Sequence, residues 1–335
     1  MLTVGQERSP LIEINGDIKI KVVAFTANGE YIVGGGGGQV GVWGVGDGKQ
    51  IAIMAAREVR CLAVSRDGRW IAAGTDKGEV CVWDAKRFEK VLTHWESGIT
   101  GVDFSPDSTR LLVASMNRTA TVWDVAARKK VLTLGGHVNW VAAAKYSPQG
   151  DRIATATVNI DSVRVWDSND GRLLIDIPVK VFPWYNTGLL WSNNHLFVVS
   201  HGTIKQLEAS TGSAVSEWPV PDPFFTNVEP RIALPRHGKF IAYSAKDTVT
   251  LWDTSTHARL GLIQHTRSIR SIALSPDDQF LVIGTNSKTI AIKDLRDVLP
   301  ASYSTVSIVY CRTITYQNGS TANIPYFSIS VRHAS

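Results

Sequence analysis

Histidine, cysteine, serine and carboxylate side chains carry most protein chemistry, and here none of their spacings matches a catalytic or metal-binding motif. No H-E-x-x-H, G-x-S-x-G or C-x-x-C pattern occurs in the 335 residues. Because nucleophiles, metals and hydride cofactors need such converging groups, the sequence predicts no catalytic residue, no metal and no cofactor. The three cysteines, Cys61, Cys81 and Cys311, form no closely spaced pair and are expected to remain reduced thiols.

A run of five glycines, Gly34 to Gly38, invites comparison with a phosphate-binding loop. Such a loop needs a following lysine with serine or threonine, and a helix N-terminus, to hold phosphate. Neither follows the run, because the next residues have the pattern of a strand. We therefore interpret the glycines as a flexible turn between two strands.

Composition and charge exclude several classes of protein. Hydrophobic residues make up 44% of the chain and charged residues 19%, which excludes disorder for most of its length. The formal net charge of +5 is too dilute to indicate a specific nucleic-acid partner. Neither a secretory apolar segment nor a run long enough to cross a bilayer occurs, so we expect no membrane partner and a cytoplasmic protein, with the nucleus as the alternative.

Basic side chains gather in turns of the second to fourth repeats described below, as at Arg66, Lys86 and Arg128. Carboxylates such as Asp67 and Asp107 are interleaved with them. This pattern favours a solvated surface of mixed charge over a phosphate-binding patch.

An internal repeat of about 40 residues organises the chain and must position every candidate side chain. Five tryptophans end similar Val-Trp or Leu-Trp segments, and degenerate copies place Leu207 and Lys293 at the same position, which gives seven copies. The five tryptophans are Trp43, Trp83, Trp123, Trp166 and Trp252.

Each copy has the pattern of four short strands. In the copy around Trp123, β-branched and apolar runs near residues 101–105, 111–114, 120–124 and 131–134 are separated by turn residues. Ser-Pro-Asp recurs between the first and second runs, where proline presets one backbone dihedral and aspartate bonds the backbone ahead of it.

The period, the Trp-Asp pairs and the Ser-Pro-Asp turns together resemble the WD40-repeat proteins, whose unit forms one four-stranded propeller blade. The resemblance covers about residues 11–297. The repeat sequences are also similar to those of the WD40 regions of large fungal NOD-like or NACHT-linked proteins. The resemblance implies an all-β fold: a seven-bladed β-propeller of four-stranded WD40 blades.

In this family a histidine, a serine or threonine, an aspartate and the tryptophan form a buried hydrogen-bonded set, because buried polar groups must be paired. The resemblance therefore implies a structural rather than a catalytic role for these side chains. The fourth copy matches best and the third is close. The residues concerned are His137, Thr155, Asp161 and Trp166 in the fourth copy, and His94, Ser115, Asn117 and Trp123 in the third.

The two ends of the repeat array predict how the ring closes. The last copy lacks a fourth strand before Pro300, whereas Leu11 to Ile14 form a spare strand before the first copy. We expect this N-terminal strand to complete the last blade, which removes the free sheet edges of a linear array. We assign residues 1–297 to the propeller and residues 298–335 to a tail.

The tail is β-prone, and the dipeptide Asn318-Gly319 is a strong hairpin signal. Two interpretations stay open at this point. The tail either pairs along the side of the propeller or forms a partly disordered extension.

Aromatic residues outside the repeat positions are the candidate binding groups. They lie in the connections that enter consecutive blades, so they are expected along one rim, where aromatic anchors suit a protein or peptide interface. The alternative is that some of the rings fill gaps between blades. The candidates are Trp95, Trp140, Trp184, Tyr185, Phe224 and Phe225.

The sequence thus predicts a non-catalytic, monomeric scaffold that binds a protein or peptide through the narrower propeller face. Two alternatives remain, since a propeller fold alone does not fix function. One is a lactonase-like or hydrolase-like enzyme with a central metal, for which His201 is the only histidine near a suitable turn. The other is a lectin-like propeller that stacks sugars on Trp184 or Trp140.

Overall fold

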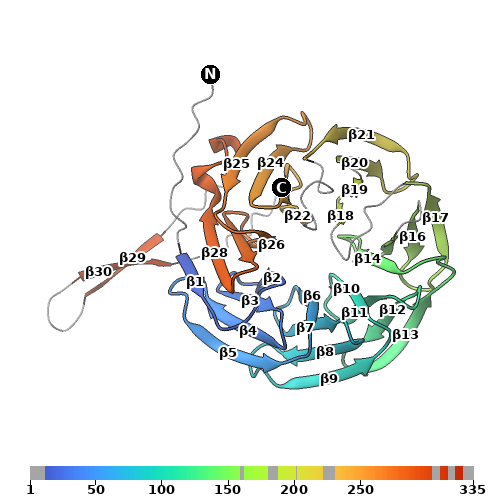
Figure 1. The fold of residues 1–335 in the computed structure, drawn as a ribbon, viewed down its shortest axis with the longest axis horizontal. Coiled ribbons are helices and arrows are strands. Elements are labelled where there is room, and N and C mark those ends of the chain that lie inside the picture. The colour runs from blue at the N-terminus through green and yellow to red at the C-terminus, as the bar shows by residue number, and fades with distance from the viewer. Residues whose placement is uncertain are drawn as a thin grey trace, which may run out of the picture.

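The computed structural model describes residues 12–158, 162–179, 188–200, 202–221 and 231–303, together with the backbone of residues 310–315 and 321–326. Within these ranges the chain forms seven four-stranded antiparallel sheets arranged in a ring (Figure 1). The first strand of each sheet lies nearest the axis and the last lies at the outer edge (Figure 1). The predicted seven-bladed propeller is confirmed.

Blades 1 to 4 follow one another along the chain, each built from four consecutive strands. Blade 1 is β2 (Val22–Phe25), β3 (Tyr31–Gly35), β4 (Gln39–Gly44) and β5 (Gln50–Ala55); blade 2 is β6 (Val59–Val64), β7 (Trp70–Thr75), β8 (Glu79–Asp84) and β9 (Lys90–Trp95). Blade 3 is β10 (Ile99–Phe104), β11 (Arg110–Ser115), β12 (Ala120–Asp124) and β13 (Lys129–Leu134); blade 4 is β14 (Val141–Tyr146), β15 (Arg152–Thr157), β16 (Val163–Asp167) and β17 (Leu173–Ile177).

Blades 5 and 6 repeat this order, and blade 7 takes its outer strand from the N-terminus. Blade 5 is β18 (Leu189–Ser192), β19 (His195–Ser200), β20 (Thr203–Glu208) and β21 (Ala214–Pro219); blade 6 is β22 (Arg231–Ala233), β23 (Phe240–Ala245), β24 (Thr248–Asp253) and β25 (Arg259–Gln264). Blade 7 is β26 (Ile269–Leu274), β27 (Phe280–Thr285), β28 (Thr289–Asp294) and β1 (Ile12–Asn15).

The N-terminal strand completes the last blade and closes the ring, as predicted from the two ends of the repeat array. Strand β1 pairs antiparallel with β28, and Ile12 and Ile14 lie opposite Ile292 and Ile290. Ile14 is buried in a cluster that also contains Trp43 of blade 1. Because β1 pairs with the last blade while its side chain packs on the first, the strand joins both ends of the ring.

The Ser-Pro-Asp turns are held by side-chain hydrogen bonds to the backbone. In blade 3 the Ser105 hydroxyl accepts a bond from the Arg110 amide at 2.9 Å, and the Asp107 carboxylate accepts one from the Thr109 amide at 3.1 Å. The turn places Ser108 at a φ of 63°, in the left-handed region. The predicted turn chemistry therefore fixes where the first strand ends and the second begins.

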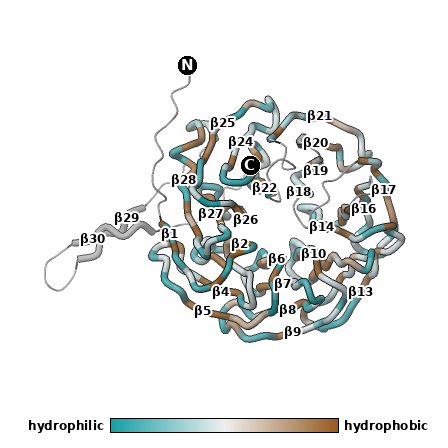
Figure 2. Tube along the Cα trace, in the orientation of Figure 1, coloured by the Kyte–Doolittle hydropathy of each residue, from teal (hydrophilic) through white to brown (hydrophobic). Residues whose placement is uncertain are grey.

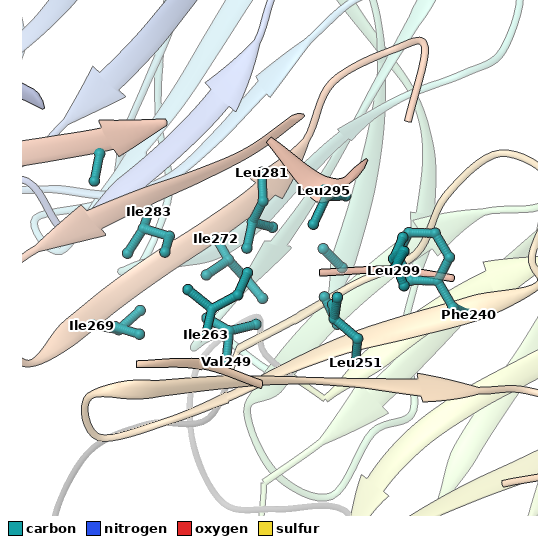
Figure 3. Close-up of a cluster of buried hydrophobic side chains, with 13 residues drawn as sticks. Phe240, Val249, Leu251, Ile263, Ile269, Ile272, Leu281, Ile283, Leu295 and Leu299 are labelled. Atoms are coloured by element: carbon teal, nitrogen blue, oxygen red, sulfur yellow. The ribbon is translucent and has the colours of Figure 1, made fainter. Parts of the chain in front are cut away.

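Apolar side chains fill the spaces between neighbouring blades rather than one central core. Figure 2 shows hydrophobic residues in every part of the ring, and central strands such as β11 are buried at consecutive positions because neighbouring blades cover both of their faces. Trp43 and Trp83 are only 2% and 1% exposed, in line with an architectural role. Between blades 6 and 7, Phe240 and Leu251 pack with Leu281 and other apolar groups (Figure 3).

The glycine run differs from the prediction of a flexible turn. Gly34 and Gly35 belong to β3 and only the residues after them turn. A Cβ atom on Gly36 would lie 1.6 Å from the Lys19 carbonyl oxygen, and one on Gly35 would lie 2.7 Å from Val59. Glycine is required here because neighbouring backbone and side chains occupy the space of a side chain.

Packing against the ring continues past the last repeat. A short 3-10 turn, η2 (Leu295–Asp297), is followed by Leu299, which is buried in the cluster between blades 6 and 7. In the second turn, η3 (Ala301–Tyr303), the Tyr303 hydroxyl donates to the Asp253 carboxylate.

Two strands of the tail, β29 (Tyr310–Thr315) and β30 (Thr321–Tyr326), pair with each other as a separate antiparallel sheet. The Asn318-Gly319 dipeptide between them lies outside the described residues. No helix in the described part of the chain is long and apolar enough to cross a bilayer.

Candidate interaction surfaces

The ring has two faces with different construction. On one face, the connections between blades bond to turns between second and third strands; the Glu96 amide donates to the Gly78 carbonyl at 2.8 Å, and the Met116 amide to the Gly98 carbonyl at 2.9 Å. We call this the connection face. The opposite face carries the Ser-Pro-Asp turns and the turns between third and fourth strands, and we call it the turn face.

Two of the predicted aromatic anchors lie exposed at the connection face. Trp95 ends β9 and is 50% exposed, while Trp140 precedes β14 and is 41% exposed. Val138, in the connection that leads to Trp140, is 66% exposed. The Arg57 guanidinium lies 5.4 Å from the centre of the Trp95 ring, a cation–π geometry. Exposed apolar groups mark an interaction site where they form a contiguous patch, whereas single exposed apolar residues occur on most protein surfaces.

The other four predicted anchors, Trp184, Tyr185, Phe224 and Phe225, lie outside the described residues. The same holds for His201, which the metal-enzyme alternative would use. The described part of the chain contains no group of three histidine, cysteine, aspartate or glutamate side chains placed to hold a metal ion.

In blade 4 the structure brings together three members of the predicted hydrogen-bonded set. Thr155 Oγ1 lies 3.0 Å from His137 Nε2 and accepts a bond from Trp166 Nε1 at 2.8 Å. His137 is 6% exposed, and burial, aided by the Arg164 charge, lowers its pKa to about 4. The fourth member, Asp161, lies outside the described residues. The neutral imidazole fits a role in holding the blade.

In blade 3 the connections differ from the predicted set. Trp123 Nε1 donates to Thr121 at 3.0 Å, and Thr121 in turn donates to the Glu96 carboxylate at 2.8 Å. The His94 ring lies 3.9 Å from the Trp123 ring, and burial lowers the His94 pKa. Thr121 lies two residues before Trp123 on the same side of the strand, so its hydroxyl is the nearest acceptor.

Ser115 and Asn117 take other partners in blade 3. The Ser115 hydroxyl donates to the Ser97 carbonyl at 2.6 Å, and the Asn117 side chain accepts from the Thr119 amide at 3.0 Å. Glu96 was not among the predicted residues. Its role could have been predicted from two local features: a glutamate in the connection before blade 3, and a threonine two residues before the tryptophan.

The axis of the ring opens on the turn face in a cavity of about 490 Å³, lined by turns from all seven blades. Its charged groups have both signs: Lys145 donates to Asp103 at 3.1 Å, and Arg66 lies in the lining nearby. Burial raises the pKa of Asp278 in the same lining to about 6, despite the opposing Arg236 amide and charge.

Basic residues at strand ends bond to groups of the protein itself, either in the next blade or in their own blade. Arg110 of blade 3 donates to the Ser168 carbonyl of blade 4 at 3.0 Å, and Arg152 of blade 4 donates to the Ala209 carbonyl of blade 5 at 3.3 Å. Lys90 pairs with Glu79 at 3.4 Å. These side chains act within the protein, so they are not part of a free basic patch.

A closed ring of seven four-stranded sheets, with Ser-Pro-Asp turns on one face and exposed aromatics on the other, defines a repeat propeller. Comparison with known families gives a match to the WD domain, G-beta repeat, at residues 48–84, 86–124, 128–167 and 258–294. Four of the seven repeats thus match the WD40 repeat, and the ring has the fold of a seven-bladed WD40 β-propeller.

Curated relatives match most of the chain at low identity. Apoptotic protease-activating factor 1 of Danio rerio is 24% identical over 70% of this chain, and Protein groucho of Drosophila melanogaster is 24% identical over 79%. Nuclear distribution protein PAC1 of Arthroderma otae is 24% identical over 67%. The chain spans 18%, 37% and 56% of the lengths of these relatives, respectively.

Proposed function

We propose that this WD40 propeller is a non-catalytic scaffold that binds a protein or peptide through its connection face, which we expect to be the narrower face. The observation that supports this most is the exposure of Trp95 and Trp140 on that face, next to Val138 and Arg57. Aromatic and arginine side chains are the groups that most often dominate binding energy at protein interfaces.

The ring supplies rigidity to this surface. Hydrogen bonds between blade connections and turns, such as that from Glu96 to Gly78, hold the loops in place before a partner arrives. Binding to a preformed surface loses less conformational entropy than binding to flexible loops. We propose that Trp184, Tyr185, Phe224 and Phe225, which lie outside the described residues, belong to the same surface, because in sequence they precede the first strands of blades 5 and 6.

We place the protein in the cytoplasm, with the nucleus as the alternative. The thiols of Cys61 and Cys81 are free, and burial raises the pKa of each to about 12. Unreactive free thiols agree with a reducing compartment.

The test is affinity capture with four forms of the protein, with partners identified by mass spectrometry. We compare wild type, Trp95→Ala with Trp140→Ala, and Trp184→Ala with Phe225→Ala. The fourth form, Ile53→Ala, removes an equally exposed apolar group from the outer strand β5 and serves as the matched control. We expect the aromatic variants to lose about 100-fold in affinity for a captured partner, and Ile53→Ala to retain it. Equal binding by all four forms would contradict the proposal.

A further inference from the structure

A second cavity, of about 500 Å³, lies between blades 5 and 6, away from the axis. Strands β19 and β20 of blade 5 form one wall, with Gln206 and Phe197 in the lining. The turns around His237 and Ser255 of blade 6 form the other wall. This volume is in the range of small-molecule sites, and neither the scaffold function nor the hydrogen-bonded sets use it.

The cavity exists because one side chain in blade 5 is short. The first residue of the second strand is Arg110 in blade 3 and Arg152 in blade 4, and each guanidinium reaches a carbonyl of the next blade. In blade 5 this position is His195, whose Nε2 lies 3.7 Å from Glu208 of its own blade. The shorter imidazole therefore leaves the groove toward Thr254 of blade 6 open.

The neighbouring groove, between blades 6 and 7, is filled by side chains rather than open. Phe240 is the first residue of β23, at the position of His195, and it is fully buried against Leu295 and Leu299 (Figure 3). An aromatic or guanidinium group at this position closes the groove. Only a smaller group, as in blade 5, leaves room for a ligand.

The lining of the cavity is rich in hydrogen-bond donors, and the carboxylates nearest to it, Glu208 and Asp278, face the lining imidazoles His195 and His237. Lys239, which is exposed to solvent, lies in the lining together with His195, His237 and His257. Gln206 is more than nine-tenths buried, and its carbonyl accepts a bond from the Ser216 hydroxyl at 2.9 Å, which leaves its amide as the donor group. A cavity with these groups complements negative charge.

Two of the imidazoles are held in fixed positions. His237 Nδ1 accepts a bond from the Lys239 amide at 3.0 Å, and its Nε2 lies 3.7 Å from Asp278. The His257 ring stacks on Trp218 with centres 4.5 Å apart and planes 16° apart. Because these contacts order the walls before a ligand arrives, little entropy is lost on binding.

We propose that the cavity between blades 5 and 6 binds an oxyanion, a phosphate or carboxylate group carried by a small soluble molecule. Lys239 supplies the charge, and the Gln206 amide and His257 imidazole supply hydrogen bonds. The site is independent of the proposed scaffold function, because its walls lie outside the connection face.

The test is isothermal titration calorimetry with inorganic phosphate, and separately with acetate, at constant ionic strength. We expect wild type to bind one of the two anions. Lys239→Ala removes an exposed charge and should weaken that anion about tenfold. His195→Phe copies the residue of blade 6, fills the groove and should abolish binding, with a melting temperature at or above that of wild type.

The matched control is Arg66→Ala, which removes a cation from the axial cavity of the turn face. We expect its anion affinity to equal that of wild type. Failure of wild type to bind either anion would overturn the proposal. Loss of binding in Arg66→Ala together with full binding in Lys239→Ala would also overturn it, because the anion would then occupy the axial cavity.

Discussion

His137 illustrates at the residue scale how burial sets a protonation state. Its ring contacts Thr155 and the Trp166 ring. Water cannot hydrate a protonated imidazole at this buried position. The lowered pKa of about 4 means that the folded protein holds this imidazole neutral while the unfolded chain protonates near pH 6.5. Acid therefore favours the unfolded state through this group.

The resulting prediction concerns the free energy of unfolding between pH 7 and pH 4. The contribution of His137 is fully present above about pH 6.5 and is lost as pH falls toward 4, with a total of about 3 kcal/mol. Asp278, whose pKa is raised to about 6, acts with the opposite sign in the same range. Urea unfolding should thus compare wild type with His137→Gln. Their difference should shrink as pH falls, and a difference that stays constant would contradict the assigned protonation.

At the element scale, the glycines at the end of β3 show how backbone contacts limit a turn. Gly36 leaves no space for a side chain, because the Lys19 carbonyl lies where a Cβ would be. Gly37, the next residue, would place its Cβ 3.6 Å from the Lys19 side chain, an ordinary contact distance. Two adjacent glycines therefore have very different requirements.

We predict that Gly36→Ala lowers the free energy of unfolding by about 2 kcal/mol or more, because the connection into blade 1 must move. Gly37→Ala is the matched control and should change it by less than about 0.5 kcal/mol. Urea denaturation of the two variants measures both values. If the two variants lowered the free energy of unfolding equally, the glycines would be required for backbone flexibility rather than for the space beside Lys19.

At the scale of the whole molecule, closure by β1 makes the ring one structural unit. The strand adds the fourth member of blade 7 and brings Ile14 against the cluster that contains Trp43 of blade 1. Removing it exposes the edge of β28 and part of an interblade core at once.

Deletion of residues 1–16 should therefore lower the melting temperature by at least about 5 °C. The control is removal of residues 304–335, whose described strands pair only with each other. Differential scanning calorimetry compares both truncations with the full chain. A larger loss from the C-terminal truncation would show that the tail, rather than β1, secures the ring.

The sequence by itself determined the repeat, the number of blades and the closing strand. These features depend on local signals: the tryptophan near the end of the third strand, the Ser-Pro-Asp turn, and the short β-branched and apolar runs between turn residues. Each signal acts within one blade, so it is readable without knowing what lies beside it. Trp140 lies in the connection before β14 as predicted, whereas Trp95, predicted in a connection, is the last residue of the outer strand β9.

Only the tertiary structure decided what happens between blades. The Thr121–Glu96 bond, the Lys19 carbonyl beside Gly36 and the open groove between His195 and Thr254 each join residues about 15 to 60 apart in sequence. Such contacts leave no periodic pattern, because they are set by how two neighbouring sheets pack. The blade was therefore predictable from sequence, whereas the interblade sites were not.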